Sequence, residues 1–166
     1  MLRVVLMGVS GCGKSSVGAA LSARLGVPYI EGDDLHPPEN VAKMARGEPL
    51  TDADRWPWLD RVAETLATRA PAIVGCSALK RIYRDRLRAG AGGALHFVHL
   101  TGDPALIAAR MAARKGHYMP PALLASQLAT LEPPGPDEGA ITLYIAQSLP
   151  EMVATVAAAL KGLRHD

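Results

Sequence analysis

The chain has 166 residues, of which 49% are hydrophobic and 20% are charged, and this predicts one globular domain with a core of its own. A net charge of +2, with two Trp, four Tyr and one Phe, is too little for the basic, aromatic surface of a general nucleic-acid-binding protein. No apolar run approaches the length that crosses a bilayer, and two cysteines make no disulfide framework. We therefore expect a soluble cytoplasmic protein that binds neither nucleic acid nor membranes.

Apolar periodicity predicts strands that alternate with helices along the chain. The apolar run 3–7 stops at a glycine, as a buried parallel strand does, and a stripe of helical period follows over 14–25. The Pro- and Gly-rich stretch 131–139 is predicted to be a loop. The alternation predicts an α/β fold, one domain over 1–166, with a parallel sheet covered by helices on both faces. Further strands are predicted over 28–30, 72–76, 95–100 and 141–145, and further helices over 40–46, 53–69, 79–89, 104–114, 120–131 and 151–160.

A phosphate-binding motif follows the first predicted strand. Residues 8–15 read GVSGCGKS and match G-x-x-x-x-G-K-[ST] without a gap. The glycines let backbone N–H groups turn toward phosphate oxygens, and the helix that follows adds the partial positive charge of its N-terminus. In this motif Lys14 reaches the β- and γ-phosphates and the Ser15 hydroxyl ligates Mg²⁺. The position between a strand and an amphipathic helix favours a nucleotide site over a chance glycine turn, and the predicted phosphate-binding residues are Gly8, Val9, Ser10, Gly11, Cys12, Gly13, Lys14, Ser15 and Ser16.

The rest of the chain favours ATP as the nucleotide. Proteins that use GTP as a switch read guanine with an Asn-Lys-x-Asp motif, and Asn40 is the only asparagine of this chain. The guanine motif is therefore absent.

Cys12 lies inside the phosphate loop, beside Lys14 and at the start of a helix, where thiols are often reactive. We expect alkylation of Cys12 to inactivate the protein and Mg-ATP to protect it. The alternative is that the loop buries the sulfur and it never reacts.

Two carboxylates, Glu31 and Asp33, follow the second predicted strand. Strand ends of an open parallel sheet face the ligand crevice, and residues two apart in an extended chain point the same way. We expect one of the two to hold a water of the Mg²⁺ ion, and the other to orient an attacking hydroxyl and accept its proton. A solvated acidic turn is the alternative. His36, before two prolines, either hydrogen-bonds a polyol or only begins the next helix.

Four cations are candidates for binding an anionic acceptor. Lys80 and Arg84 follow the third strand four residues apart, so they share a helix face that starts at the crevice. Lys43 and Arg55 lie in an irregular stretch with two Trp and two Pro, which suits an acceptor-binding insertion over about residues 36–60. Because Arg forms bidentate pairs with carboxylates, both are candidate partners of an acid group.

A cationic helix end between the fourth and fifth strands predicts a lid over about residues 110–132. Arg110 and Arg114 are four residues apart, and residues 115–117 (KGH) break the helix. Lid closure brings positive charge to the transition state of phosphoryl transfer and excludes water. Arg114 is thus a predicted catalytic cation and Arg110 a predicted phosphate ligand. The alternative is a helix C-terminus whose cations only offset its dipole.

Several blocks of the chain carry a family resemblance. The phosphate loop is common to many kinases, but CSALK at 76–80 and RKGH at 114–117 are far more specific. With these blocks the chain resembles, over nearly its whole length, the bacterial gluconate kinases, which are P-loop small-molecule kinases related to the shikimate kinases. The other matching parts are residues 6–11, 32–33, 35–37, 43–45, 47–50, 52, 54–55, 57–59 and 83–84 with Gln127, Leu131 and Glu132.

The resemblance implies a P-loop kinase fold with a five-stranded parallel sheet of order 2-3-1-4-5. It implies ATP- and Mg²⁺-dependent phosphorylation of D-gluconate at its terminal hydroxyl, which gives 6-phosphogluconate in carbohydrate acid catabolism, and a homodimer. It places Asp33 at the acceptor hydroxyl, and Arg110, Arg114 and His117 in the lid. Together with Lys14, Asp33 and Arg114 are the implied catalytic residues. The implied substrate-binding residues are Asp33, His36, Lys43, Arg55, Ser77, Lys80, Arg84, His117 and Gln127.

The chain departs from the family pattern at a few positions. Glu31 stands where we expect Asp and is one methylene longer, and Cys12 occupies a loop position that is often Ser or Ala. Ile145 and Gln147 stand near the last strand where relatives can carry Asp, so adenine contacts are not carried over.

Two other functions compete with this one. A shikimate kinase or another small-molecule kinase is the first, but shikimate kinases have a Gly-rich turn where this chain has residues 76–80. A nucleotide-sensing binding protein is the second, and it would not need Asp33 together with Lys80, Arg84 and a lid.

Overall fold

The computed structural model describes residues 1–113 and 121–163, and these form a five-stranded sheet. Its order, β2-β3-β1-β4-β5, confirms the predicted 2-3-1-4-5 order. Every neighbouring pair of strands is parallel. The strands are β1 (Arg3–Met7), β2 (Tyr29–Glu31), β3 (Ala72–Gly75), β4 (His96–Thr101) and β5 (Ile141–Tyr144).

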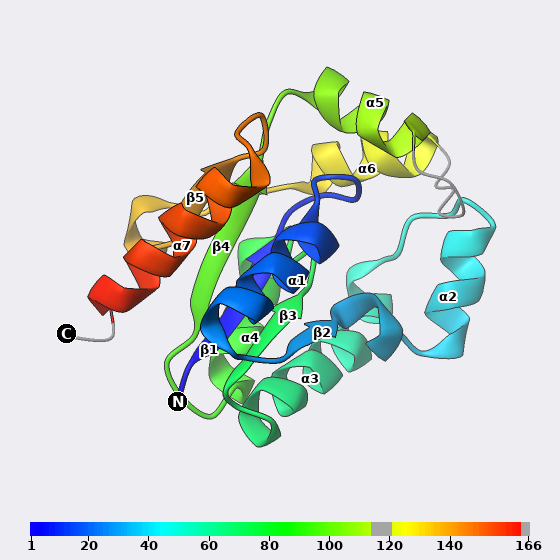
Figure 1. Cartoon of the computed structure of the whole chain (residues 1–166). Coiled ribbons are helices and arrows are strands. Elements are labelled where there is room, and N and C mark those ends of the chain that lie inside the picture. The colour runs from blue at the N-terminus through cyan, green and yellow to red at the C-terminus, as the bar shows by residue number, and fades with distance from the viewer. Residues whose placement is uncertain (114–120, 164–166) are drawn as a thin grey trace.

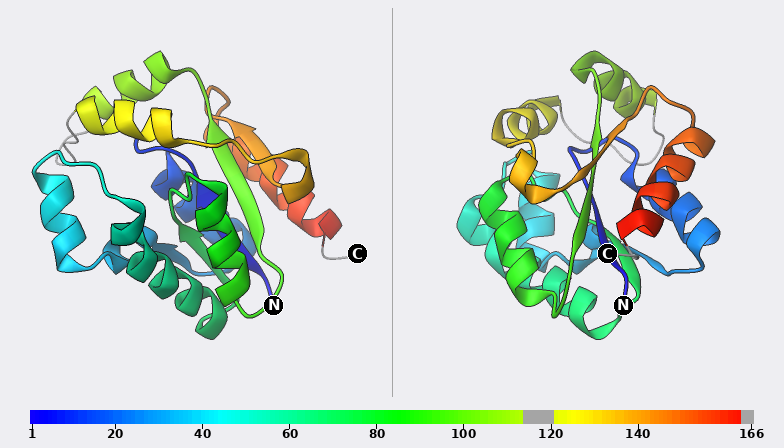
Figure 2. Two further views of the ribbon diagram at one scale, coloured as in Figure 1. Left: turned by 180° about the vertical axis from the view of Figure 1, so that it is seen from behind. Right: turned by 90° about the vertical axis from the view of Figure 1, so that its left-hand side faces the viewer.

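Helices cover both faces of the sheet, as predicted (Figures 1 and 2). α1 and α7 pack together on one face and α3 and α4 on the other, while α5 and α6 lie across the carboxyl ends of the strands. The helices are α1 (Lys14–Leu25), α2 (Pro38–Ala45), α3 (Asp52–Thr68), α4 (Arg81–Gly90), α5 (Pro104–Ala113), α6 (Pro121–Thr130) and α7 (Leu149–Leu163), with 3₁₀ turns η1 (Gly32–Leu35) and η2 (Pro136–Glu138).

The central strand β1 and its neighbour β3 are buried on both sides. Residues 4–7 of β1 and all of β3 are buried, which is why both are continuous apolar runs rather than alternating ones. Because the strands are parallel, their carboxyl ends lie at one edge of the sheet, where open α/β sheets bind ligands. The register pairs Leu6 with Gly75, so the loops after β1 and β3 begin side by side.

In the described part of the chain, the ends of the predicted helices and strands differ from those of the structure by at most three residues. Two local expectations are too broad. The irregular stretch that contains Lys43 and Arg55 is limited to residues 46–51, because a capping box between Thr51 and Asp54 starts α3 and the helix continues through Pro57. Burial of the neighbouring Trp58 stabilises that continuation. The predicted loop 131–139 also contains one short regular piece, the turn η2.

Among the described residues, none of the helices combines the length and the apolar character that a membrane span requires.

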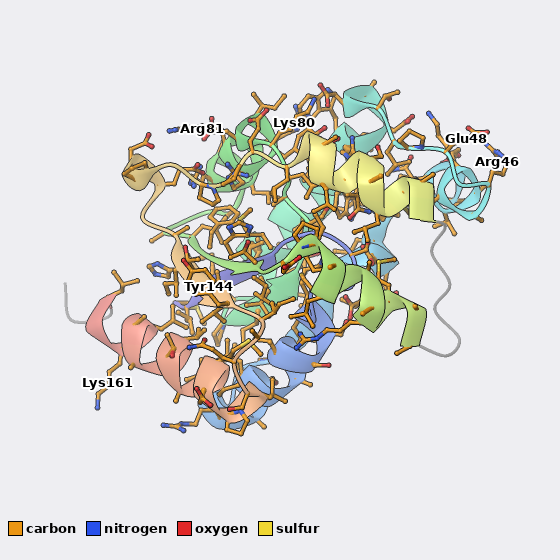
Figure 3. The ribbon with its side chains drawn as sticks, turned by 90° about the horizontal axis from the view of Figure 1, so that it is seen from above. Arg46, Glu48, Lys80, Arg81, Tyr144 and Lys161 are labelled. Atoms are coloured by element: carbon orange, nitrogen blue, oxygen red, sulfur yellow. The ribbon has the colours of Figure 1, made fainter. Side chains whose placement is uncertain are left out.

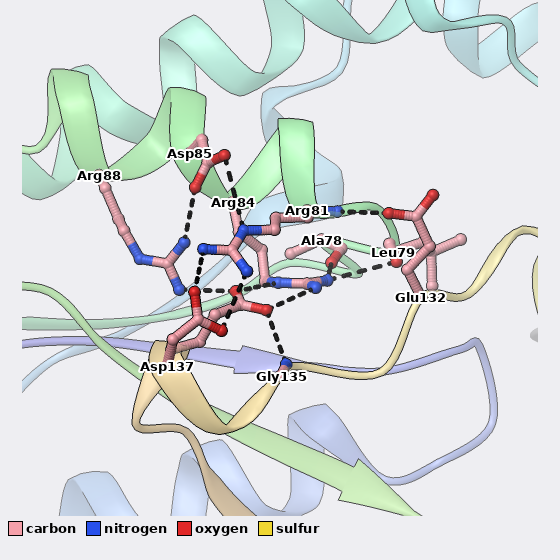
Figure 4. A network of polar contacts seen from close by, with 10 residues as sticks. Ala78, Leu79, Arg81, Arg84, Asp85, Arg88, Glu132, Gly135 and Asp137 are labelled. Atoms are coloured by element: carbon pink, nitrogen blue, oxygen red, sulfur yellow. Dashed lines mark hydrogen bonds and ion pairs between the residues drawn. The ribbon is translucent and has the colours of Figure 1, made fainter.

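Arg84 is the clearest departure from the sequence prediction. Its side chain is fully buried, and its Nε and Nη2 donate to the Glu138 carboxylate at 2.7 and 3.1 Å (Figure 4). Its Nη1 donates to the carbonyl oxygens of Ala78 at 2.8 Å and Leu79 at 3.3 Å. Arg84 therefore does not share a crevice-facing surface with Lys80. It ties α4 to the turn η2 and to the loop after β3.

Glu138 is as buried as Arg84 and binds four donors. Besides the two from Arg84, its oxygens accept from Arg88 Nη2 at 2.7 Å and from the N–H of Gly135 at 3.0 Å. The hydrogen bonds from Arg84 lower the pKa of the Glu138 carboxyl to about 2. A buried guanidinium with a fully bonded carboxylate is stable, whereas either group alone carries a large desolvation penalty.

We predict that Glu138→Ala lowers the free energy of unfolding by about 3 kcal/mol or more, because Arg84 stays buried without its counter-ion. In the wild type this stabilisation is complete above the ordinary carboxyl pKa of 4.5 and is lost as the pH falls toward 2, since the folded-state pKa is the lower one. Urea unfolding between pH 7 and pH 2 measures both effects. Asp137→Ala is the matched control, because its ion pair with Arg81 is exposed. Equal stability of the two variants at pH 7 would contradict the prediction.

Candidate active site

Two adjoining cavities open at the carboxyl edge of the sheet. The larger has a volume of about 710 Å³ and the smaller of about 60 Å³. Ser10, Lys14 and Asp33 line both, so one boundary carries a loop hydroxyl, a cation and a carboxylate. The larger is also lined by residues of the phosphate loop and α1, of β2 and η1, of α5, and of α7 with the segment before it: Gly11, Cys12, Gly13, Ser15, Ser16, Val17, Glu31, Asp34, Arg110, Met111, Gln147, Leu149 and Met152. The smaller is also lined by His36, Met44, Glu48, Pro49, Leu50, Arg55, Trp58, Ser77, Leu79, Leu123, Ser126 and Gln127.

The phosphate loop has the backbone that its sequence predicts. Gly8 has φ +147°, and a Cβ there would lie 2.7 Å from the carbonyl oxygen of Leu100, so only glycine fits. The Gly8 N–H donates to the carbonyl oxygen of Ser77 at 3.2 Å, which joins this loop to the one after β3. Lys14 Nζ donates to the carbonyl oxygens of Gly8 and Val9 at 2.8 and 3.1 Å. The ammonium group thus lies across the loop, at the boundary of the two cavities.

Gln127 joins α6 to the phosphate loop. Its Oε1 accepts from the backbone N–H of Ser10 at 2.8 Å, and its Nε2 donates to Ser10 Oγ at 3.2 Å. Gln127 therefore contacts the phosphate loop directly while it lines the smaller cavity.

The oxygen donors predicted for Mg²⁺ lie side by side. Ser15 Oγ donates to Glu31 Oε2 at 2.7 Å, and both residues line the larger cavity. A hydroxyl and a carboxylate at a phosphate loop suit Mg²⁺, which is typically held by one or two carboxylates, waters and substrate phosphates. No group of three or more His, Cys, Asp or Glu among the described residues offers a metal cage of its own. The donor set fits a metal that arrives with a nucleotide.

Trp58 fixes the turn that carries Asp33. Trp58 Nε1 donates to the carbonyl oxygen of Gly32 at 2.8 Å, and the indole stacks on the His36 ring at 4.0 Å. Burial and the nearby Arg55 lower the pKa of His36 to about 4, so the imidazole is neutral at neutral pH. Its Nδ1 lies 3.2 Å from Asn40 Nδ2 and accepts from that amide, which leaves the proton on Nε2. His36 follows η1 and lies two residues before α2 begins at Pro38, and it offers the smaller cavity a neutral hydrogen-bond donor.

Arg55 is the predicted acceptor cation that lines the smaller cavity. Its Nη1 donates to the carbonyl oxygen of Leu50 at 2.6 Å and to the Tyr83 hydroxyl at 3.0 Å, and its guanidinium lies over the Tyr83 ring. Tyr83 in turn donates to the Asp52 carboxylate. Because only one Arg55 nitrogen is engaged in these bonds, donors remain for a ligand.

Lys43 and Lys80 are engaged with carboxylates of α3 instead. Lys43 Nζ lies 2.8 Å from Asp54 Oδ2, and Lys80 Nζ lies 3.0 Å from Asp52 Oδ1. Neither belongs to the described residues that line the smaller cavity. Lys80 precedes α4 at one margin of the molecule (Figure 3).

Arg110 is the cation of the predicted lid that lies within the described residues. It lines the larger cavity near the end of α5, and its Nη2 donates to the carbonyl oxygen of Ile145 at 2.8 Å. Arg114 and His117 lie outside the described residues, so their predicted roles remain predictions.

Sequence reasoning missed the aromatic residues that hold the site. Trp58 and Tyr83 are buried and bond the turn of Asp33 and the guanidinium of Arg55, while Tyr29 bonds Glu31. Their patterns are those of ordinary core residues, and only their polar atoms distinguish them.

Comparisons with known proteins agree with this geometry. A family model described as an AAA domain matches residues 4–134. The gluconokinase of Gluconobacter oxydans (strain 621H) is 51% identical over 83% of this chain and 79% of its own. The crystal structure of a gluconokinase from Sinorhizobium meliloti 1021 is 53% identical, with a TM-score of 0.90 over 98% of this chain and 93% of its own. A shikimate kinase from Bacteroides thetaiotaomicron, 15% identical with a TM-score of 0.72 over 96% of this chain and 98% of its own, shares the fold alone.

Both cysteines are buried and carry free thiols. The Cys12 side chain is only 1% exposed, and its Sγ lies 3.9 Å from Lys14 Nζ inside the folded loop. This agrees with the alternative prediction that the loop buries the sulfur. Burial raises the pKa of the Cys76 thiol to about 12. Reagents need an accessible thiolate, so neither sulfur is available in the folded chain.

We predict that the native protein shows no rapidly reacting thiol and that two appear on unfolding. Titration with Ellman's reagent, with and without guanidinium chloride, counts them. Cys12→Ser and Cys76→Ser assign any reacting thiol, and a fast native reaction that only Cys12→Ser abolishes would restore the expectation of a reactive loop cysteine.

Proposed function

The chain belongs to the gluconokinase family, and from this membership we propose that it transfers the γ-phosphoryl group of ATP to D-gluconate, giving 6-phosphogluconate and ADP. One observation carries the proposal: the nucleotide-sized cavity and the smaller cavity share Ser10, Lys14 and Asp33. Phosphoryl transfer needs a donor phosphate and an acceptor hydroxyl at one such boundary.

The larger cavity is the proposed nucleotide site. Backbone N–H groups of residues 8–15 bind the phosphates, and Lys14 turns from its loop carbonyls to the β- and γ-phosphates. Mg²⁺ would be held by Ser15 and, through water, by Glu31, and when bound it neutralises charge on the phosphate oxygens. Arg110 and Gln147 line the part of this cavity that lies toward α7, where we place the nucleoside.

The smaller cavity is the proposed acceptor site. Asp33 orients the attacking hydroxyl and takes its proton, as a carboxylate at the boundary of the two cavities is placed to do. His36 Nε2 donates to a second hydroxyl. The unengaged nitrogens of Arg55 bind the carboxylate of the acid, where a planar guanidinium forms two parallel bonds. Ser77 and Gln127 supply further polar groups.

The acceptor site has to open before it is filled. Its 60 Å³ hold a few waters and not a six-carbon acid. The segment 44–50 and α6 line it from the predicted insertion and the predicted lid, so we propose that these two segments move apart when the acid enters. A homodimeric assembly is a proposal supported by the family resemblance alone, and a cytoplasmic location is a proposal supported by the composition of the chain.

A shikimate acceptor is the weaker alternative. Residues 76–80 of this chain read CSALK, where shikimate kinases carry a Gly-rich turn. The fold shared with a shikimate kinase does not identify the acceptor.

We predict Mg-ATP-dependent formation of ADP that rises with D-gluconate and not with shikimate. A coupled ADP assay over a panel of sugar acids, with water alone as the control, measures it. ADP formation that ignores gluconate and responds to shikimate would replace the proposed acceptor, and ADP formation that responds to no acid would leave only a nucleotide-binding protein.

We predict that Asp33→Asn lowers kcat by about 10²-fold or more while ATP still binds, because general-base help contributes roughly 10²–10⁴-fold. Asp34→Asn is the matched control: Asp34 lies in the same turn and lines the larger cavity only. Steady-state kinetics and calorimetric ATP titration separate turnover from binding. If turnover of Asp33→Asn stayed within about threefold of the Asp34→Asn value, Asp33 would have no role as a general base.

A further inference from the structure

Tyr29 is the residue of the site whose role neither the sequence pattern nor the proposed reaction assigns. We propose that Tyr29 is a positioning residue of the metal site: its hydroxyl holds the Glu31 carboxylate where that carboxylate binds a water of Mg²⁺. The inference rests on the proposed function, since it deepens the role given to Glu31.

Each oxygen of Glu31 has its own donor. The Tyr29 hydroxyl lies 3.2 Å from Oε1 and the Ser15 hydroxyl lies 2.7 Å from Oε2. Two donors on two oxygens fix the rotation of the carboxylate, which one donor leaves free. Because Ser15 donates its single hydroxyl proton to Glu31, the lone pairs of Ser15 Oγ remain available to a cation.

The Tyr29 ring is held by packing and not by its bond to Glu31. A Cβ on Gly18 in α1 would lie 2.3 Å from Tyr29 Cε2, and a Cβ on Gly75 at the end of β3 would lie 2.2 Å from the Tyr29 hydroxyl oxygen. The ring therefore occupies space that two neighbouring elements leave open only because both residues are glycine. A hydroxyl fixed in this way is placed before the metal arrives.

The length of the Glu31 side chain explains why a second hydrogen bond, from the Tyr29 hydroxyl, is needed. Glu has one methylene and one rotatable bond more than Asp, so its carboxylate has more positions to lose on binding. The second hydrogen bond offsets that freedom. An Asp carboxylate on the same backbone ends one methylene earlier and falls short of a hydroxyl that Glu31 already meets at 3.2 Å.

The Tyr29 hydroxyl also keeps its proton. A phenolic hydroxyl has an ordinary pKa of about 10, and a carboxylate at hydrogen-bond distance can only accept from it. The group is accordingly a hydrogen-bond donor to Glu31 throughout the neutral range.

The test is calorimetric titration of ADP into the wild type and Tyr29→Phe, in EDTA and over a series of Mg²⁺ concentrations. We expect Tyr29→Phe to bind ADP in EDTA like the wild type, and to need about three- to tenfold more Mg²⁺ for half of the Mg²⁺-dependent gain in affinity, the range that one hydrogen bond supplies. Tyr144→Phe is the matched control, because Tyr144 is 62% exposed on β5, the edge strand opposite β2 (Figure 3).

A double-mutant cycle with Glu31→Asp separates positioning from a general effect. In the Glu31→Asp background we expect Tyr29→Phe to leave the Mg²⁺ requirement unchanged. An equal increase in both backgrounds, an unchanged Mg²⁺ requirement in Tyr29→Phe, or weaker ADP binding in EDTA would each overturn the inference. A wild type that binds no ADP, or binds it without regard to Mg²⁺, would instead count against the proposed function.

Discussion

The parallel pairing of β1 between β3 and β4 is the constraint on which the site depends. It brings the phosphate loop beside the loop after β3, and the bond from the Gly8 N–H to the Ser77 carbonyl oxygen joins them. The β2 edge adds Glu31 and Asp33 at the same level. No side chain has to reach far to meet the others, because the sheet has already placed the chain segments. The chemistry is then distributed over short loops, which the buried strands hold rigid.

Charge pairing decides which of the cations near the site keep N–H donors that a ligand could use. Four of the five N–H donors of Arg84 are engaged by Glu138 and two carbonyl oxygens, and the side chain is fully buried, so it organises the loop after β3 and is not exposed to a substrate. Lys43 and Lys80 are paired with carboxylates of α3 at the rim. Arg55 differs, since it is fixed through one nitrogen and lines the cavity. Proximity to the crevice in sequence is therefore a weaker guide than the number of donors left unused.

The sequence predicts this fold and the phosphate loop well because both are governed by local patterns. A β-branched run, a Gly-rich turn and an amphipathic helix are each specified within a few residues, and residues 8–15 need no distant partner to be recognised. Arg84 is mispredicted for a physical reason: spacing of four places it on the face of Lys80, but spacing says nothing about which side of the helix is buried. Its partner Glu138 lies 54 residues away, in a segment read as loop. The role of Tyr29 could not be predicted for a similar reason: the space for its ring is left by Gly18 and Gly75, which belong to two other elements.

The link between α6 and the phosphate loop has a consequence for the order of events. Gln127 bonds the Ser10 N–H and hydroxyl, while Leu123 and Ser126 of the same helix line the smaller cavity, the proposed acceptor site. If α6 moves to admit an acid, these two hydrogen bonds break, and each contributes only about 1 kcal/mol. The Ser10 N–H that is then released lies in the loop that binds phosphate. One movement of α6 would therefore both open the proposed acceptor site and release the Ser10 N–H for a phosphate. The reverse movement would bring Gln127 back to the boundary of the two cavities. Closure there would exclude water, as phosphoryl transfer to a hydroxyl requires.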